Sequence, residues 1–423
     1  MKGKHLVVIS FDAMVSEDLD LLSSMPCFGN FLKEGSRVSR IRSCYPSLTY
    51  PAHTTILTGT GTGKHGIVNN EPFEPGNLKC SWYWFHDPVK VKDIHQVAKE
   101  KGLVTASVFW PVTGAHPYVD HLMAEYWAQG PQDTFEEAHF RAGTSEKDYK
   151  EIIEPLKGIL DCHDSIITDE GKTLVACEFI KRYKPNLITI HLGQIDSMRH
   201  KNGIFNGIVE KAAIKSEEYL SMIMEACKEA GIYEETNFIV LSDHGQINYS
   251  RKMNLNKIFV DGGFATVNND GSLSSWKAFG KSANFSAHIY VSDPSLEGEV
   301  YKYLCFLRDK GSYGIGTVLT KEESKLKYGL YGDFSFVLES DGTTLFTNDW
   351  KGELFIPANG LKASHGHDPD IGPQPVFAAF GPDIKKGVIL SKGNLIDEAP
   401  TMAHLLELSL PEAEGKAFDS ILY

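Results

Sequence analysis

The chain has no long apolar run. Among its 423 residues, no stretch of roughly 18 consecutive apolar residues occurs, which is the length that a membrane-spanning helix needs. The first apolar stretch, Leu6–Phe11, is shorter than the hydrophobic part of a signal peptide and leads directly into an aspartate. We therefore expect no membrane partner and a cytoplasmic protein.

Cysteine is sparse and scattered. The chain has seven cysteines, at positions 27, 44, 80, 162, 177, 227 and 305, and none forms a CxxC pair. An odd number with such spacing suggests neither a disulfide framework nor a thiolate zinc site. This cysteine usage favours a reducing compartment.

Positive charge is also in short supply. Lysine and arginine number 42 against 55 aspartates and glutamates, so the net charge is −13. A protein that follows a nucleic-acid polymer through phosphate contacts needs a basic stripe. We therefore exclude a nucleic-acid polymer as partner and expect a small substrate, while no heptad pattern indicates an oligomeric state.

Short apolar runs alternate with amphipathic segments. The runs typical of buried strands are Leu6–Phe11, Val104–Phe109, Leu187–His191, Phe238–Leu241 and Pro375–Phe380. Helical periodicity occurs over Asp18–Lys33, Thr173–Tyr183, Ile208–Ala230 and Ala399–Leu406. This alternation predicts an α/β fold with a mostly parallel central sheet flanked by helices.

Two regions interrupt the alternation. Residues 251–359 contain Gly-rich turns and short alternating segments such as His288–Val291, which predict a smaller, strand-rich α+β subdomain inserted in the core. Residues 112–150 are predicted to be a loop-rich insertion. The catalytic α/β core then comprises residues 1–250 and 360–423.

Acidic and imidazole side chains follow several predicted strands. They are Asp12, Asp196, His200, Asp243 and His244, and His365 precedes the last strand. Because ligands bind beyond the carboxyl ends of the strands in an open parallel sheet, we expect these six side chains to converge at one edge. An acid after a strand is often only a helix cap, and a lone histidine is often structural. Their joint occurrence is what indicates a metal centre.

The spacing of these residues allows joint ligation. Asp196 and His200 are four residues apart, so they share one face of a helix. Asp243 and His244 would point to opposite faces of a regular strand, and an irregular backbone, which Gly245 permits, would be needed to bring them together. Mixed carboxylate and imidazole ligands suit zinc, with manganese or iron as alternatives. Six such ligands and a hydroxyl are enough for two metals about 3.5–4 Å apart.

A hydroxyl candidate lies in the stretch YPSLTYPAH, residues 45–53. Pro51 predicts the first residue of a helix, which places Thr49 at the helix N-terminus. Unpaired N–H groups and the positive end of the helix dipole favour an anion there, such as an alkoxide or a phosphate. A threonine hydroxyl is a poor nucleophile unless it is deprotonated, and a divalent metal can stabilise the deprotonated form.

Several motifs occur in one order between residue 4 and about residue 410. They are Asp12 and the stretches YPSLTYPAHTTILTG, KHGIVNN, SVFWP, DSMRH, LSDHG and SHGHDP. Together they resemble the nucleotide pyrophosphatase/phosphodiesterase family of the alkaline phosphatase superfamily. The resemblance implies an alkaline phosphatase-like fold and a hydrolase of phosphodiester or pyrophosphate bonds whose substrate could be a nucleotide. His367 and Pro369 depart from the family's pattern but leave His365 in place.

The resemblance also implies roles for individual residues. Thr49 would be the nucleophile that becomes transiently phosphorylated. One zinc would be held by Asp12, Thr49, Asp243 and His244, and the other by Asp196, His200 and His365. Asn70 would donate to the phosphoryl oxygen beside the backbone N–H of Tyr50, and the Tyr50 ring would stack on a nucleobase. A second stacking partner could be Tyr126, Trp127 or an aromatic of the cluster at 81–85.

Other functions remain open. A phosphomonoesterase, a phosphonate hydrolase or a phosphosugar mutase of the same superfamily could use almost the same metal cage. A monoesterase would need a strong cation for the extra phosphate charge, which Arg199 could supply. A sulfatase is disfavoured because no arginine follows Thr49 in the required motif. A non-catalytic binding protein is disfavoured by the intact ligands and nucleophile.

Overall fold

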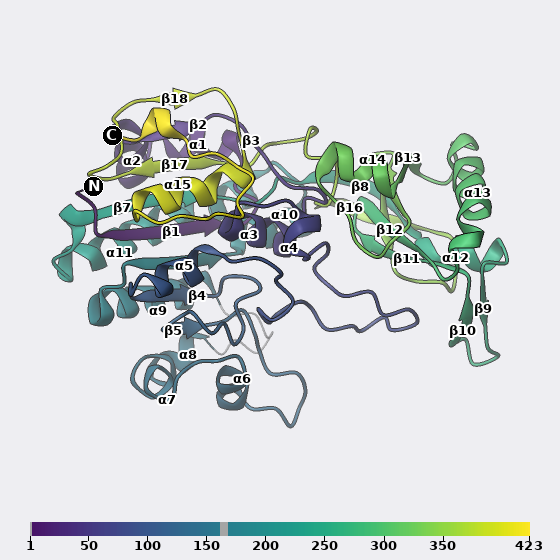
Figure 1. Cartoon of the computed structure of the whole chain (residues 1–423), viewed down its shortest axis with the longest axis horizontal. Coiled ribbons are helices and arrows are strands. Elements are labelled where there is room, and N and C mark those ends of the chain that lie inside the picture. The colour runs from purple at the N-terminus through teal and green to yellow at the C-terminus, as the bar shows by residue number, and fades with distance from the viewer. Residues whose placement is uncertain (1, 161–167) are drawn as a thin grey trace.

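The computed structural model describes residues 2–160 and 168–423, and its centre is an eight-stranded sheet in the order β18-β2-β17-β7-β1-β6-β4-β5. The strands are β1 (His5–Phe11), β2 (Ser36–Val38), β4 (Thr105–Val108), β5 (His121–Met123), β6 (Leu187–Leu192), β7 (Thr236–Leu241), β17 (Phe377–Phe380) and β18 (Ile389–Leu390). Strands β7, β1, β6, β4 and β5 run parallel, whereas β17 runs antiparallel to β7 and β2. The prediction of an α/β fold with a mostly parallel central sheet is confirmed (Figure 1).

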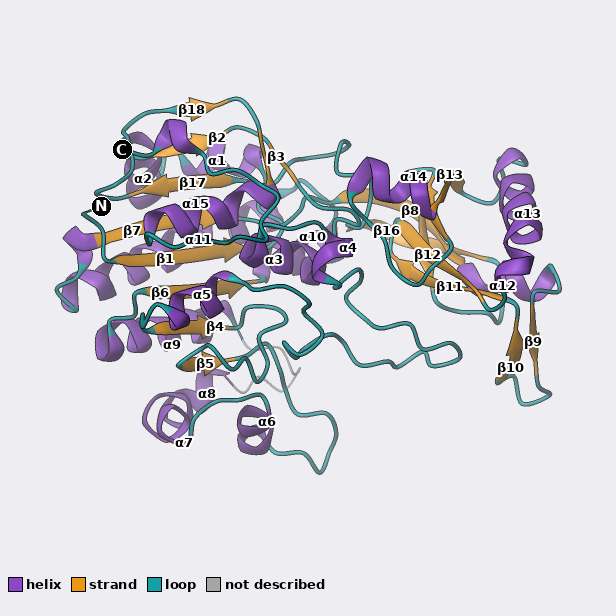
Figure 2. Cartoon of the chain, in the orientation of Figure 1, coloured by secondary structure: helices purple, strands orange, loops and turns teal. Residues whose placement is uncertain are grey.

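Helices cover both faces of this sheet, because successive side chains of a strand point to opposite faces. On β1, Val7 and Ile9 pack on one side and Leu6 and Val8 on the other. The first face is covered by α1 (Ser16–Leu22), α2 (Pro26–Glu34), α9 (Asp169–Tyr183) and α11 (Gly207–Glu229). The second is covered by α3 (Thr49–Thr58), α5 (Ile94–Glu100) and α15 (Glu398–Leu405). The core therefore has two apolar layers separated by the sheet (Figure 2).

The structure differs from the predicted elements in three places. The single helix predicted over Asp18–Lys33 is two helices, and Pro26 begins the second. Helix α3 begins at Thr49 rather than at Pro51. Proline is tolerated at its third position because the N–H groups of the first turn lack intrahelical partners. The segment 112–150 was predicted to be loop-rich, but it contributes β5 to the edge of the central sheet.

The region after β7 forms a separate group of sheets, drawn in green in Figure 1. A four-stranded antiparallel sheet has the order β11-β12-β14-β13 and a three-stranded sheet has the order β15-β8-β16. Their bounds are β8 (Ile247–Asn254), β11 (Ala278–Ala283), β12 (Ser286–Val291), β13 (Ile315–Thr320), β14 (Phe336–Ser340), β15 (Thr344–Thr347) and β16 (Phe355–Ser364). Helices α12 (Leu255–Asp261), α13 (Glu297–Asp309) and α14 (Lys321–Tyr328) and the hairpin β9 (Ala265–Val267) and β10 (Leu273–Trp276) complete it. Strand β8 runs across the predicted boundary at residue 251, and β16 runs across the one at residue 359. The division of the chain at these two positions stays a prediction.

The remaining elements are short. They are α4 (Thr62–His65), α6 (Phe135–Arg141), α7 (Glu146–Asp148), α8 (Lys157–Leu160), α10 (Gln194–Asn202), β3 (Ile41–Arg42) and β19 (Gly393–Asn394). Among the described residues, no helix is both long enough and apolar enough to cross a bilayer. The cytoplasmic location stays a prediction from the sequence.

A buried carboxyl group joins the green region to the core. Glu339 accepts hydrogen bonds from the Tyr45 hydroxyl (2.5 Å) and from the Asp368 backbone N–H (2.9 Å). Burial raises the pKa of Glu339 to about 8 despite these donors.

An unfolded glutamate loses its proton near pH 4, so the stability of the protein should fall as the pH rises from about 4 to about 8. We expect Glu339→Gln to flatten this dependence, which melting temperatures of both proteins at about pH 5 and pH 8 would show. An equal fall in both proteins would contradict this origin.

Candidate active site

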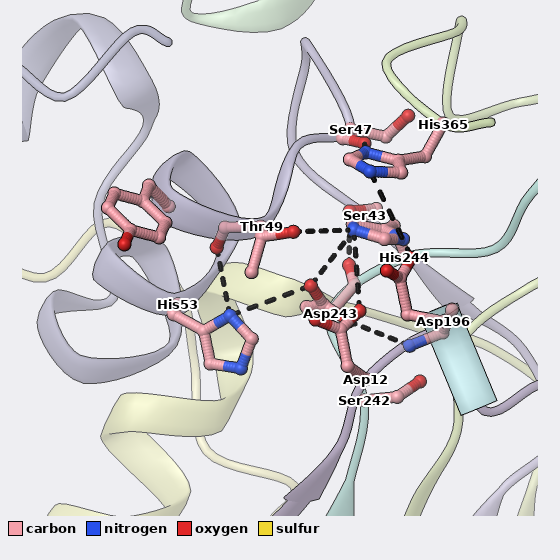
Figure 3. A network of polar contacts seen from close by, with 12 residues as sticks. Asp12, Ser43, Ser47, Thr49, His53, Asp196, Ser242, Asp243, His244 and His365 are labelled. Carbon is pink, nitrogen blue, oxygen red and sulfur yellow. Dashed lines mark hydrogen bonds and ion pairs between the residues drawn. The ribbon is translucent and has the colours of Figure 1, made fainter. Parts of the chain in front are cut away.

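The six predicted acids and histidines lie together at the carboxyl ends of the central strands. Asp12 follows β1, Asp243 and His244 follow β7, and Asp196 and His200 lie on α10, which follows β6. His365 follows β16. Figure 3 shows Asp12, Asp196, Asp243, His244 and His365 gathered on one side of Thr49. The ligand atoms form two compact groups, Asp12 with Asp243 and His244, and Asp196 with His200 and His365.

The first cluster (Asp12, Asp243, His244) is fully enclosed. His244 Nε2 lies 3.1 Å from Asp243 Oδ2 and 3.6 Å from Asp12 Oδ1. The same nitrogen lies 3.1 Å from Thr49 Oγ1. Asp12 Oδ1 and Asp243 Oδ2 are buried without a hydrogen-bond partner. Buried polar atoms are rarely left unpaired, so this arrangement fits a cation that binds between these side chains.

The second cluster (Asp196, His200, His365) has histidines in the tautomer that a metal requires. His200 Nδ1 donates to the Ala363 carbonyl oxygen (2.8 Å), and His365 Nδ1 donates to that of Ser47 (3.1 Å). Each ring therefore turns its Nε2 toward Asp196 Oδ1, at 3.3 Å and 4.0 Å. Backbone carbonyls commonly fix metal-binding histidines in this way. The rings of His244 and His365 stack 3.9 Å apart, which places the two clusters side by side.

The electrostatics of the site follow from three buried carboxylates. Burial and the neighbouring charges of Asp243 and Asp196 raise the pKa of Asp12 well above its usual value. Burial, together with Asp196, also raises the pKa of Asp243. For Asp196, His200 and His365 outweigh the effect of burial and lower the pKa. The protein alone therefore disfavours full ionisation of this group, and a divalent cation would reverse that preference.

Gly245 is required for a reason other than the predicted one. A Cβ atom built at this position would lie 2.0 Å from the Pro373 carbonyl oxygen. No left-handed backbone occurs at Gly245. The glycine therefore allows a close approach of two chain segments behind Asp243 and His244, rather than an unusual backbone angle.

Three supporting residues were not assigned to the site from the sequence. His191 Nε2 lies 3.0 Å from Asp12 Oδ2, and Gln246 Nε2 donates to Asp196 Oδ1 at 2.5 Å. His53 Nδ1 donates to the Thr49 carbonyl oxygen (2.8 Å) and lies 3.5 Å from Asp243 Oδ2. His191 pairs with Ser10 across β6 and β1, two residues before Asp12. A polar residue in an otherwise apolar strand next to the Asp12 strand was the signal that could have revealed it.

Thr49 lies in the first turn of α3, where N–H groups lack helical partners. One of these, the Tyr50 N–H, donates to the Asn70 side-chain oxygen at 3.0 Å. Because that oxygen is the acceptor, the Asn70 NH₂ group faces the other way and stays available as a donor. The structure thus brings Thr49, Tyr50 and Asn70 together as predicted, although the Tyr50 N–H already has an acceptor.

The predicted stacking role of the Tyr50 ring does not fit its position. The ring is 0% exposed and packs in an apolar cluster with Ile67, Trp84 and Val112. Trp82 lies edge-on to it at 5.3 Å and is 37% exposed. The sequence does not reveal this packing, because a buried and an exposed aromatic at the second position of a helix look alike. The accessible aromatic near Asn70 is Trp82, from the predicted cluster at 81–85.

Arg199, the candidate cation for a monoesterase, is not available to a substrate. Its side chain is 0% exposed and donates to Asp18 Oδ2 and to the Ile204 carbonyl oxygen, each at 2.5 Å. The ion pair joins α10 to α1. Arg199 is therefore used to hold the helix that carries Asp196 and His200.

A third group of possible ligands, His86, Asp93 and His116, lies apart from the two clusters. His116 Nδ1 accepts from the Tyr118 N–H (3.1 Å), so its Nε2 carries the proton and donates to Asp93 Oδ2 (2.7 Å). Asp93 Oδ1 accepts from the Gln96 N–H at the start of α5. This hydrogen-bonded arrangement indicates a structural role for His116 and Asp93.

An α/β sheet with two adjacent aspartate–histidine clusters at one edge, and a threonine hydroxyl 3.1 Å from His244 of the first cluster, defines the class of protein: an α/β protein with a candidate two-metal centre. The sequence matches the family described as type I phosphodiesterase / nucleotide pyrophosphatase over residues 6–367, and the chain belongs to this family.

Individual relatives agree with this placement. Venom phosphodiesterase from Naja atra is 24% identical over 256 residues, which cover 57% of this chain and 26% of that protein. Bis(5′-adenosyl)-triphosphatase ENPP4 from Pongo abelii is 22% identical over 418 residues, which cover 95% of this chain and 78% of that protein. The solved structure of murine ectonucleotide pyrophosphatase/phosphodiesterase 5 matches with a TM-score of 0.72 at 20% identity, covering 99% of this chain and 100% of that one. The chain thus spans about a quarter of the length of the venom enzyme but shares the whole fold of the murine structure.

Proposed function

We propose that this protein is a metal-dependent hydrolase of phosphodiester or pyrophosphate bonds, with Thr49 as nucleophile. The observation that carries the proposal is the position of Thr49 Oγ1, 3.1 Å from His244 Nε2 in the first turn of α3. Two divalent cations would be held by Asp12, Thr49, Asp243 and His244, and by Asp196, His200 and His365. Zinc suits this donor set best, with manganese or iron as alternatives.

The unpaired atoms of the site support such ligands. Asp12 Oδ1 and Asp243 Oδ2 have no hydrogen-bond partner, and His200 and His365 turn their Nε2 atoms toward Asp196. Bound divalent cations would lower the pKa of the Thr49 hydroxyl and neutralise charge on the phosphoryl group. The first cluster is fully buried, and its low-dielectric surroundings strengthen these interactions.

The residues of the chain would then act in order. Thr49 Oγ1 attacks phosphorus, the bond to the leaving group breaks, and a phosphothreonine forms. The NH₂ group of Asn70, whose oxygen accepts from the Tyr50 N–H, donates to the phosphoryl oxygens, where negative charge develops. Water later cleaves the phosphothreonine and restores the hydroxyl.

A nucleotide is the substrate class that we propose. Relatives bear the names nucleotide pyrophosphatase and bis(5′-adenosyl)-triphosphatase, and a solved structure of an inactive variant of the murine relative is described as a complex with AMP. In this chain, the exposed ring of Trp82 lines the same cavity as Asn70.

The proposal predicts a defined order of reactivity. With zinc present, a nitrophenyl phosphodiester should be cleaved faster than the nitrophenyl monoester or phosphonate ester, because Arg199 is buried and paired with Asp18 and cannot bind the extra charge of a monoester. Complete chelation should abolish turnover and added zinc should restore it. Faster cleavage of the monoester would favour a phosphomonoesterase and leave the metal site standing. Turnover that survives complete metal removal would reject the mechanism.

A further inference from the structure

A cavity of about 350 Å³ opens onto one side of the proposed metal centre. Its lining includes His200 and His365 of the second cluster, together with Asn70 and Trp82. The far wall comes from the green region and includes Tyr249, Lys252, Asn284 and Asn348. Thr49 and the members of the first cluster do not line it. The cavity therefore opens over the second cluster, and Leu48 and Asn70 extend its wall to the start of α3, next to Thr49.

This position corresponds to the leaving group. In a two-metal displacement, the attacking and leaving oxygens lie in line on opposite sides of phosphorus, and each faces its own cation. Thr49 belongs to the first cluster through His244. The leaving group of a substrate attacked by Thr49 therefore points toward His200 and His365, and into this cavity.

The charge of the cavity wall comes from one lysine. Among the described residues that line it, the side chains with a permanent charge at neutral pH are Glu71 and Lys252. Glu71 forms an ion pair with the buried Lys281, whose ammonium also lies 3.1 Å from Cys80 Sγ. Its negative charge is therefore compensated inside the protein. The Lys252 ammonium makes no hydrogen bond or ion pair with any residue that the structure describes.

Lys252 lies on the cavity wall beside an aromatic ring and an amide group. The residue lies in β8 between β15 and β16, opposite Leu345 and Ile356. Its ammonium lies 6.0 Å from the centre of the Tyr249 ring. Asn348 Oδ1 accepts from the Ser282 N–H (2.8 Å), which turns the NH₂ group of Asn348 the other way. An uncompensated ammonium and an amide NH₂ group on one wall make a site that suits an anion.

We propose that Lys252 is a specificity-determining residue that binds a phosphate group carried by the leaving group, so that the site favours pyrophosphate anhydrides over esters with uncharged leaving groups. This inference rests on the proposed function and adds a residue and a subsite to it. Solvent weakens the attraction between a phosphate and a half-buried ammonium less than it weakens the attraction to an exposed one. A hydrogen bond between charged groups is also stronger than one between neutral groups.

The test compares two substrates that share the same nucleotide part. ATP has pyrophosphate as leaving group, and the 4-nitrophenyl ester of AMP has nitrophenolate. We expect Lys252→Met to lower kcat/KM for ATP by about tenfold to hundredfold, and to lower kcat/KM for the nitrophenyl ester by less than about threefold. Lys252→Arg should recover part of the selectivity, because it restores the charge.

A second readout separates a binding role from a structural one. Salt screens the attraction between charges, so KM for ATP should rise with ionic strength more steeply in the wild type than in Lys252→Met. Lys302→Met, which removes an exposed lysine on α13, serves as the control and should leave kcat/KM unchanged for both substrates.

Equal losses of kcat/KM for both substrates in Lys252→Met, or an unchanged ratio between the two values, would overturn the role of Lys252. If the wild type with zinc cleaves the nitrophenyl ester but not ATP, the inference fails and the proposed function stands. If it cleaves neither, the proposed function fails and the inference with it.

Discussion

Alanine at position 49 is expected to lower kcat for a phosphodiester by about 10⁴-fold or more, while the protein keeps its metal. The reason is that Thr49→Ala removes the atom that forms the covalent bond to phosphorus but leaves Asp12, Asp243 and His244 in place. Steady-state turnover and the metal content of the purified protein, measured by mass spectrometry, check both parts. A non-catalytic binding protein would be indifferent to this change.

Two further variants make the result specific. Thr49→Ser keeps the hydroxyl and should retain measurable turnover. Thr54→Ala removes a buried hydroxyl of the same helix, which donates to the Tyr50 carbonyl oxygen (2.8 Å), and should stay within a few-fold of the wild type. Turnover by Thr49→Ala close to that of Thr49→Ser would exclude a phosphothreonine. A similar loss in Thr54→Ala would indicate damage to the helix instead.

The sequence allowed prediction of the fold and of the ligand groups because both depend on strand ends. Apolar runs marked β1, β6 and β7, and the polar residue that follows such a run must lie at the carboxyl edge of a parallel sheet. Asp12 and Asp243 therefore could be placed together although 230 residues lie between them in the chain. The four-residue spacing of Asp196 and His200 placed both on one helical face.

Features that depend on packing between distant segments could not be predicted. The burial of Tyr50 depends on Ile67, Trp84 and Val112, which come from separate loops. The need for Gly245 arises from the Pro373 carbonyl, more than a hundred residues later. Strand β5 has three residues and gives no periodic signal, so its pairing with β4 is visible only in the structure. The accessibility of side chains and the tautomers of histidines in the site could not be predicted either, because residues that are distant in the sequence determine them.

Asparagine at position 12 is expected to have opposite effects on the metal-free and the zinc-bound protein. In the metal-free protein, Asp12 is buried beside Asp243 and Asp196, and their repulsion with the cost of burial raises its pKa. Asp12→Asn removes this unfavourable charge and should raise the melting temperature without metal. With zinc, the same change removes a ligand, so the stabilisation by the metal should shrink and turnover should fall by at least about a hundredfold. Thermal melts with a chelator and with excess zinc, beside turnover, measure both effects.

Asp93→Asn provides the matched control. The surroundings of Asp93 stabilise its charged form, whereas those of Asp12 destabilise it. Asp93 is also buried, but it accepts hydrogen bonds from His116 and from the Gln96 N–H, and the neighbouring histidines outweigh burial and lower its pKa. Asp93→Asn should therefore destabilise the metal-free protein, by about 1–3 kcal/mol, and should leave the zinc-induced shift in melting temperature unchanged. If Asp12→Asn instead melted below the metal-free wild type, repulsion among the three carboxylates would not be the dominant force in the empty site. If zinc raised the melting temperature of Asp12→Asn as much as that of the wild type, Asp12 would not be a metal ligand, because losing a ligand should weaken zinc binding.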